Sequence, residues 1–426
     1  MVLQPGTAVA PIVLHYPCRL DNDGSELSVL RKPLVLLLAT AVLILLLGLR
    51  GSEPSATSYW LTRDAAPHVV GGIPWMVQNL AEKLQRDSGQ GPATPESVLL
   101  YFDLVGRYNG ECRSDWETPG AQDSRPDSAC TSLRSDLDAQ GPAVERLIQQ
   151  QTSLALQEQG LGGGPWPPGG AFPPVLFTLR PPPTLLVVSP RNRIEMVGRV
   201  LLDPELTLSQ AEALEAEVSR HNLSAMVTRI GGLGVYPSVV PESADLQWVL
   251  RTVAHEWAHQ FFALRPLGWR YACGIEGDRR MVALNETAAE IIGREVGNLV
   301  YRQAYGGTPS EQPELTPSEI RFREQMRELR SQVDELLQQG RVEDAEHLME
   351  SRRQELNSEG FRLRVLNQAY FAFHGNYAED PYLGGAEGQE ISSRMHTLRE
   401  NSGSLGAFAW AISSVGSYEG FLRLSD

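Results

Sequence analysis

The stretch HEWAH at residues 255–259 decides how the rest of this sequence is interpreted. Apolar residues recur around it at helical spacing, and start and stop signals on either side predict a helix over about 243–264. Residues four apart share one helix face, so His255 and His259 can bind a single metal ion. Glu256 would lie beside that ion, where it can take a proton from a metal-bound water. A pattern this short also arises by chance; its position on an amphipathic helix makes that explanation weaker, and a second motif weakens it further.

A second helical pattern follows in LNETAAEIIG at residues 284–293. Its apolar residues mark one helix face, and Glu286 and Glu290 share another. Carboxylates in this position can bind a metal ion or a metal-bound histidine. Alternatively, the two carboxylates could belong to a helix face that is exposed to solvent. The histidines upstream favour the first interpretation.

The combination of H-E-x-x-H with a later helix that carries N-E-x-x-x-E resembles the gluzincin zinc metallopeptidases, the thermolysin-like group. The resemblance covers about residues 246–296. It implies that Zn²⁺ is bound by three side chains, those of His255, His259 and Glu286. It further implies that Glu256 is the general base and that Glu290, at a position that is often Asp in that group, orients a zinc-bound histidine. The motif is specific for the metal centre and carries no information about the substrate.

The resemblance implies an α+β catalytic domain of the zincin type over 175–426, with a mixed sheet above the metal helix and a helical C-terminal lobe. The sequence agrees in its order, with strands over 184–188, 194–201, 225–230 and 233–240 and a helix over 209–222. The last strand, Gly232–Val239, would be a sheet edge that holds extended peptide by main-chain pairing, or an ordinary edge strand. Gluzincin aminopeptidases carry an acidic residue there and this segment has none, so we expect an endopeptidase.

Two later segments carry further candidate features. Residues 316–357 are charged, periodic and capped, which predicts a helical hairpin. It would be a partner-binding arm or a solvated helix pair with one packed stripe. Aromatic residues near the end of the chain predict a buried helix with Tyr370, His374 and Tyr377. Gluzincins stabilise the tetrahedral intermediate with a Tyr or His of the C-terminal lobe, so these three are catalytic candidates; core packing or helix capping is the alternative.

The N-terminal part of the chain predicts attachment to a membrane. Residues 34–49 are apolar and uncharged, although slightly short for the hydrocarbon core of a bilayer. A signal peptide is the rival interpretation, but about thirty residues precede the run, which favours an uncleaved anchor over 33–52. Arg31 and Lys32 place the tail, residues 1–32, in the cytoplasm and the rest outside. We therefore expect a single-pass protein of the cell membrane with an extracytoplasmic catalytic domain.

Composition suggests how the remaining regions are used. Residues 53–159 are predicted to be a helical extracytoplasmic region, and the Gly/Pro-rich stretch 160–174 a linker between domains. Cys112 and Cys130 could form a disulfide outside the cytoplasm or remain buried thiols. The formal net charge of −15 argues against nucleic acid as a partner.

These features predict a membrane-anchored zinc metallopeptidase that hydrolyses a peptide or protein substrate. Zinc would lower the pKa of a bound water, and Glu256 would remove its proton and pass it to the leaving amine. One rival is a zinc amidohydrolase for a non-peptide or cell-wall substrate, which would share every metal residue. The other is a membrane-tethered scaffold with a non-catalytic metal site. The motif retains every ligand and the base, which counts against this second rival.

Overall fold

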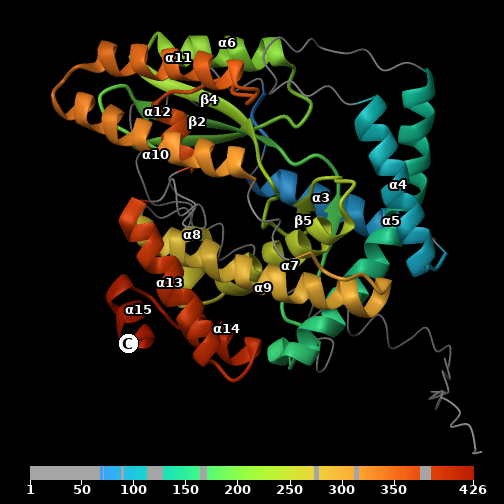
Figure 1. Ribbon diagram of the computed structural model, residues 1–426. Helices are drawn as coiled ribbons and strands as arrows, with labels where there is room; N and C mark the ends of the chain where they lie inside the picture. Colours follow the sequence, from blue (N-terminus) through green and yellow to red (C-terminus); the bar gives the residue numbers. More distant parts are fainter. Residues whose placement is uncertain are drawn as a thin grey trace, which may run out of the picture. The chain divides into compact units, whose positions relative to one another are not determined.

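The computed structural model describes residues 68–70, 72–87, 91–112, 128–163, 170–272, 278–310, 316–374 and 385–426. The predicted tail and anchor over 1–52 and the candidate residue Tyr377 lie outside these ranges. Among the helices that the structure describes, none combines the length and the apolar character needed to cross a membrane. The described residues form an α+β fold that is mostly helical (Figure 1), which confirms the predicted fold class at this level.

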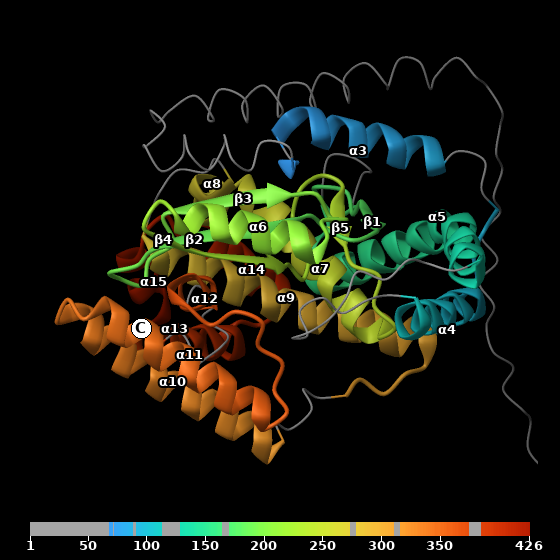
Figure 2. The ribbon, with the colours of Figure 1, turned by 90° about the horizontal axis from the view of Figure 1, so that it is seen from above.

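A three-stranded antiparallel sheet in the order β3-β2-β4 forms one part of the fold. The strands are β2 (Thr184–Pro190) in the middle, β3 (Gly198–Leu202) and β4 (Leu223–Arg229). The helix α6 (Leu208–Ser219) lies along one face of this sheet (Figure 2). Side chains alternate between the two faces of a strand, and Leu186 and Val188 of β2 share a core with the buried residues of α6. A capping box at Thr207 fixes where α6 begins.

The other face of this sheet is covered by three helices. They are α10 (Pro317–Gln338), α11 (Val342–Ser358) and α12 (Gln368–His374). Leu185 and Val187, which alternate with the residues facing α6, share a core with Met326 and Val333 of α10. The apolar stripe of the helical hairpin within 316–357 therefore packs against the sheet, while its charged residues remain outside this core.

Residues 232–239, which precede the helix with the HEWAH stretch, do not form an edge strand of that sheet. β5 (Ser238–Val240) pairs in parallel with β1 (Phe177–Leu179) in a separate two-stranded sheet. Just upstream the chain folds back, because Leu233 N donates to Val239 O (2.9 Å) and Val239 N donates to Leu233 O (3.1 Å). Pro237 has no amide hydrogen, and the glycines around it favour turns, so the predicted edge strand over Gly232–Val239 is wrong. We call residues 232–239 the covering hairpin.

The largest core lies among helices, with α7 (Leu246–Ala263) against α9 (Arg279–Tyr305). The remaining helices are α3 (Gly72–Asp87), α4 (Pro95–Glu111), α5 (Ser128–Leu156), η2 (Gln157–Leu161), α8 (Pro266–Ala272), α13 (Gly385–Asn401), α14 (Leu405–Ser413) and α15 (Tyr418–Ser425). Buried residues of α4 and α5 belong to the same core as those of α7 and α9. Side chains from both sides of the stretch 160–174 are thus packed together, and its use as a domain boundary stays a prediction.

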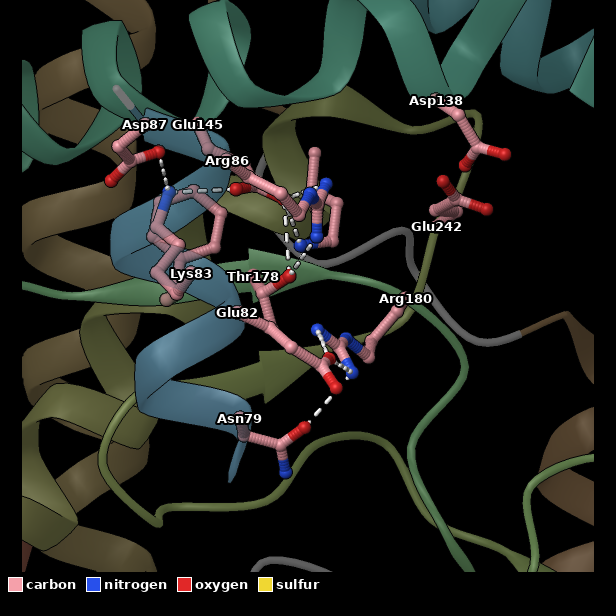
Figure 3. Close-up of polar contacts among 12 residues, drawn as sticks. Asn79, Glu82, Lys83, Arg86, Asp87, Asp138, Glu145, Thr178, Arg180 and Glu242 are labelled. Carbon is pink, nitrogen blue, oxygen red and sulfur yellow. Dashed lines mark hydrogen bonds and ion pairs between the residues drawn. The ribbon is translucent and has the colours of Figure 1, made fainter. Parts of the chain in front are cut away.

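Polar contacts tie the early helices to the segments that flank the metal helix (Figure 3). Lys83 of α3 and Glu145 of α5 form a fully buried ion pair (2.7 Å), and Glu145 also accepts from the backbone N of Leu179 in β1 (2.7 Å). Arg134 of α5 donates to both carboxylate oxygens of Glu242 (2.6 and 2.9 Å), four residues before α7. A buried carboxylate such as that of Glu242 needs a partner of this kind, so the contact with Arg134 helps to fix where α7 starts relative to α5.

Cys112 and Cys130 form a disulfide, with a Cα–Cα distance of 5.5 Å. Cys112 follows the last residue of α4 and Cys130 lies in the first turn of α5. The bond joins the two helices on either side of residues 113–127. Of the two alternatives for this pair, the structure has the disulfide.

Candidate metal centre

The HEWAH helix, α7, starts three residues beyond the predicted helix start and ends one residue short of the predicted end. The carboxylate of Asp245 caps it by accepting from Trp248 N (3.1 Å). Its apolar face is buried in the largest core, which includes Val249, Val253 and Trp257. This packing turns His255 and His259 together toward α9, because residues four apart share a face.

Two glycines of α9 allow it to lie against the backbone of α7. A Cβ atom at Gly293 would lie 2.8 Å from the carbonyl O of Arg251 and 2.9 Å from Cβ of His255. A Cβ atom at Gly297 would lie 2.5 Å from the backbone N of Arg251. Side chains cannot be accommodated at these distances, so the helix crossing requires glycine at both positions. The close crossing brings the carboxylates of α9 opposite the histidines of α7.

Three ligand atoms converge at this crossing. Nε2 of His255 and Nε2 of His259 are 3.0 Å apart, and Oε2 of Glu286 lies 3.6 Å from the first and 3.5 Å from the second. Three ligands of one tetrahedral zinc ion, each about 2.0–2.1 Å from it, are separated by about 3.3–3.4 Å. The two histidines and Glu286 therefore form a group that could hold one metal ion.

Polar contacts on the far side of each ring favour one tautomer. Nδ1 of His259 lies 2.8 Å from Oδ1 of Asn285, an oxygen that only accepts, so Nδ1 carries the hydrogen. Nδ1 of His255 faces Oε2 of Glu290 at 3.5 Å, which is long for a hydrogen bond but favours the same tautomer. Both Nε2 lone pairs then point at one place. The two Nε2 atoms lie 3.0 Å apart, and a cation beside them could bind both lone pairs, so the site fits a metal.

The electrostatics of the cluster also call for positive charge. Burial lowers the pKa of His255, but hydrogen bonding to the carboxylates of Glu286 and Glu290 outweighs it and raises that pKa well above its usual value. Burial likewise raises the pKa of Glu286, and the two histidines more than reverse this, so its pKa falls far below its usual range. A divalent cation supplies the same positive charge as ring protons and displaces them on binding.

Glu256 is the most enclosed carboxylate of the site. Glu256 is 6 % exposed. Burial raises the pKa of its carboxyl group, and this effect outweighs the charges of the two histidines, which lower that pKa. One side of the carboxylate lies against the covering hairpin, because a Cβ atom at Gly232 would overlap Oε1 and one at Gly234 would lie 3.1 Å from Oε2. A buried carboxylate beside a bound metal ion would be suited to accept a proton and return it.

Two of the three candidates for stabilising the tetrahedral intermediate, Tyr370 and His374, lie on α12. Tyr370 is buried in the core beneath the sheet, where α12 packs against β2 and β4. Its ring lies against the ring of His374, with the centroids 4.3 Å apart and the planes tilted by 43°. The described contacts thus place Tyr370 and His374 with the sheet, and a role for either at the metal stays a prediction. Tyr377 lies outside the described residues.

Asn285 is a site residue that sequence reasoning did not assign. It is only 1 % exposed, and it is the Asn of the N-E-x-x-x-E pattern, directly before Glu286. The pattern could have pointed to it, since a histidine ligand needs an acceptor for its second ring nitrogen.

We expect Asn285→Ala to weaken metal binding by about 10–100-fold, because the ring of His259 loses the acceptor that orients it. A competition titration against a chromophoric chelator measures this. Asn298→Ala is the matched control, since Asn298 also lies on α9 and its Oδ1 also accepts from an α7 side chain, Gln247 Nε2 (3.0 Å). Equal losses of affinity in the two variants would show that Asn285 acts only through the helix packing.

Comparisons with protein-family models, with curated proteins and with solved structures find no match for this chain. The function must therefore be inferred from the site itself.

Proposed function

We propose that this protein is a zinc-dependent peptidase of the gluzincin type that cleaves peptide bonds outside the cytoplasm. The observation that carries the proposal is the convergence of Glu286 Oε2 on the two Nε2 atoms, at 3.5–3.6 Å. Two histidines on one helix can meet by helix geometry alone, but the third ligand comes from a different helix. Two histidines and one carboxylate are the ligand set of catalytic zinc sites in which a position is left open.

Each residue has a distinct part in the proposed reaction. When bound, zinc supplies Lewis acidity, which lowers the pKa of water and polarises a carbonyl group. Glu256 accepts a proton from the attacking water and returns it to the nitrogen of the leaving amine. Asn285 and Glu290 hold the rings of His259 and His255 in the orientation that the site needs.

The described residues form an α+β fold, and a zincin-type arrangement of its catalytic domain is part of the proposal. A small sheet and a two-helix metal site occur together with further helices in the C-terminal region. The covering hairpin stands where an edge strand was expected, so the peptide must be held by other surfaces. The hairpin carries no carboxylate that could bind a free amino terminus, which favours an endopeptidase over an aminopeptidase.

Location outside the cytoplasm has two supports. The run at 34–49 would anchor the chain in the cell membrane. The Cys112–Cys130 disulfide is typical of an oxidising compartment. The protein would then be a single-pass membrane enzyme whose partners are peptide or protein substrates, and its negative charge opposes binding to nucleic acid.

The test uses the purified full chain in detergent, with zinc quantified and a broad peptide library digested. We expect one zinc per chain and internal cleavage products that disappear after chelation and return when zinc is restored. Release of single N-terminal residues would overturn the endopeptidase assignment. Stoichiometric zinc without any peptide cleavage would contradict peptidase function and would favour the amidohydrolase or scaffold alternative.

A further inference from the structure

The covering hairpin is fastened to the metal helix directly beside a ligand. Gln260 follows His259, and its Nε2 donates to the carbonyl O of Val235 and to Oγ of Ser238 (2.7 Å). Gln260 is only 7 % exposed, so its two hydrogen bonds are shielded from competing water. The hairpin is closed on itself by the paired backbone bonds between Leu233 and Val239. It is therefore a formed structure held at a definite place.

The main chain of this hairpin lies on the base and on a ligand. A Cβ atom at Gly232 would overlap the carboxylate of Glu256, and a Cβ atom at Gly234 would lie 2.9 Å from Cβ of His259. Gly231, one residue earlier, has no atom within 4 Å of its Cβ position. The requirement for glycine is thus specific to the two positions that touch the site.

The hairpin lies against the base, which is buried. Glu256 and Glu286 are 6 and 9 % exposed, whereas His255 and His259 are half-buried. The base is therefore enclosed while the two histidine ligands remain partly open. Without the hairpin the Glu side chain, with three rotatable bonds, would gain other conformations.

We propose that residues 232–239 form a fixed main-chain wall that holds the Glu256 carboxylate in place and keeps bulk water from it, with Gln260 as the positioning residue that fastens the wall. The inference rests on the proposed function, and it adds a residue outside the H-E-x-x-H motif to the catalytic arrangement. A general base works best when it is held in the geometry of the reaction.

The first test compares Gln260→Leu with Gln247→Leu. Both glutamines lie on α7, both are 7 % exposed, and each donates two side-chain hydrogen bonds, but Gln247 donates to Asn298 and Ser310, away from the hairpin. Peptide-resolved mass spectrometry would follow the labelling of Glu256 by a carbodiimide and an amine. This labelling measurement requires neither bound metal nor turnover, so it tests the role of the hairpin even if the protein proves not to be a peptidase.

In Gln260→Leu we expect labelling of Glu256 and hydrogen exchange at the amides of Leu233 and Val239 to accelerate about tenfold or more. We expect kcat to fall about tenfold, with zinc content and KM retained, and Gln247→Leu to match the wild type in all readings. Unchanged labelling of Glu256 in Gln260→Leu, or the same changes in Gln260→Leu and Gln247→Leu, would contradict the proposal that the hairpin shields Glu256. Faster labelling with unchanged kcat would overturn the positioning role.

A second pair of variants tests the wall through its backbone. Gly232→Ala forces the hairpin or the carboxylate to move, whereas Gly231→Ala adds a methyl group in open space. We expect kcat to fall about tenfold or more in the first and to change less than about twofold in the second, with both unfolding cooperatively near the wild-type temperature. Equal activities in the two variants would contradict the proposal.

Discussion

Replacing Glu256 with Gln should leave the metal bound and lower kcat/KM by roughly 10²–10⁴, the usual contribution of a general base. Gln has nearly the shape of Glu and can occupy the same space beneath the covering hairpin, but its amide cannot accept the proton of the attacking water. The three ligand atoms belong to other residues, so the metal site itself is unchanged. Steady-state kinetics with zinc quantified in the same samples would measure both effects.

Glu295→Gln serves as the control for this substitution. Glu295 lies on α9 and pairs with Arg399 (2.7 Å), outside the metal cluster. This pair touches none of the three ligands or the base, so activity should stay within about twofold of the wild type. If Glu256→Gln kept its turnover, the proton would be transferred by another group and the proposed mechanism would be wrong.

The second large effect is expected from Gly297→Ala. The added Cβ would lie 2.5 Å from the backbone N and 2.6 Å from Cα of Arg251, so α9 must move away from α7. Overpacking of this type costs about 1–3 kcal/mol of the free energy of unfolding. Alanine favours a helix over glycine by about 1 kcal/mol, so a net loss would come from the contact and not from propensity. The shift would also carry Glu286 and Glu290 away from the histidines and weaken metal binding.

Thermal unfolding and a chelator titration would measure the two consequences. Gly110→Ala is the matched control, because Gly110 also lies inside a helix, α4, and no atom lies within 4 Å of its Cβ position. It should be as stable as the wild type or slightly more so. Wild-type stability and metal affinity in Gly297→Ala would mean that the two helices do not cross as closely as described.

The metal helix was predictable because its determinants are local. Helical spacing alone places His255 and His259 on one face, and the buried apolar face of α7 agrees with the pattern. The meeting with Glu286 was expected only through the resemblance, since no rule of spacing joins residues of two helices. It depends on the close crossing at Gly293 and Gly297, which the sequence shows as glycines without showing what they touch.

The covering hairpin was mispredicted for a physical reason. Leu233 and Val235 alternate with small residues as in a half-buried strand, and this pattern cannot reveal that Leu233 pairs with Val239 within the same segment. The choice of β1 as the partner of β5 is equally non-local. The contact between Arg134 and Glu242, which ties α5 to the start of α7, joins residues 108 positions apart and leaves no periodic signal.

The most direct test is anomalous X-ray diffraction at the zinc edge from crystals grown with zinc. The account predicts one zinc peak, about 2.0–2.2 Å from Nε2 of His255, from Nε2 of His259 and from a carboxylate oxygen of Glu286. No peak at that place, or a peak bound by the two histidines with the Glu286 carboxylate turned away from it, would contradict the account.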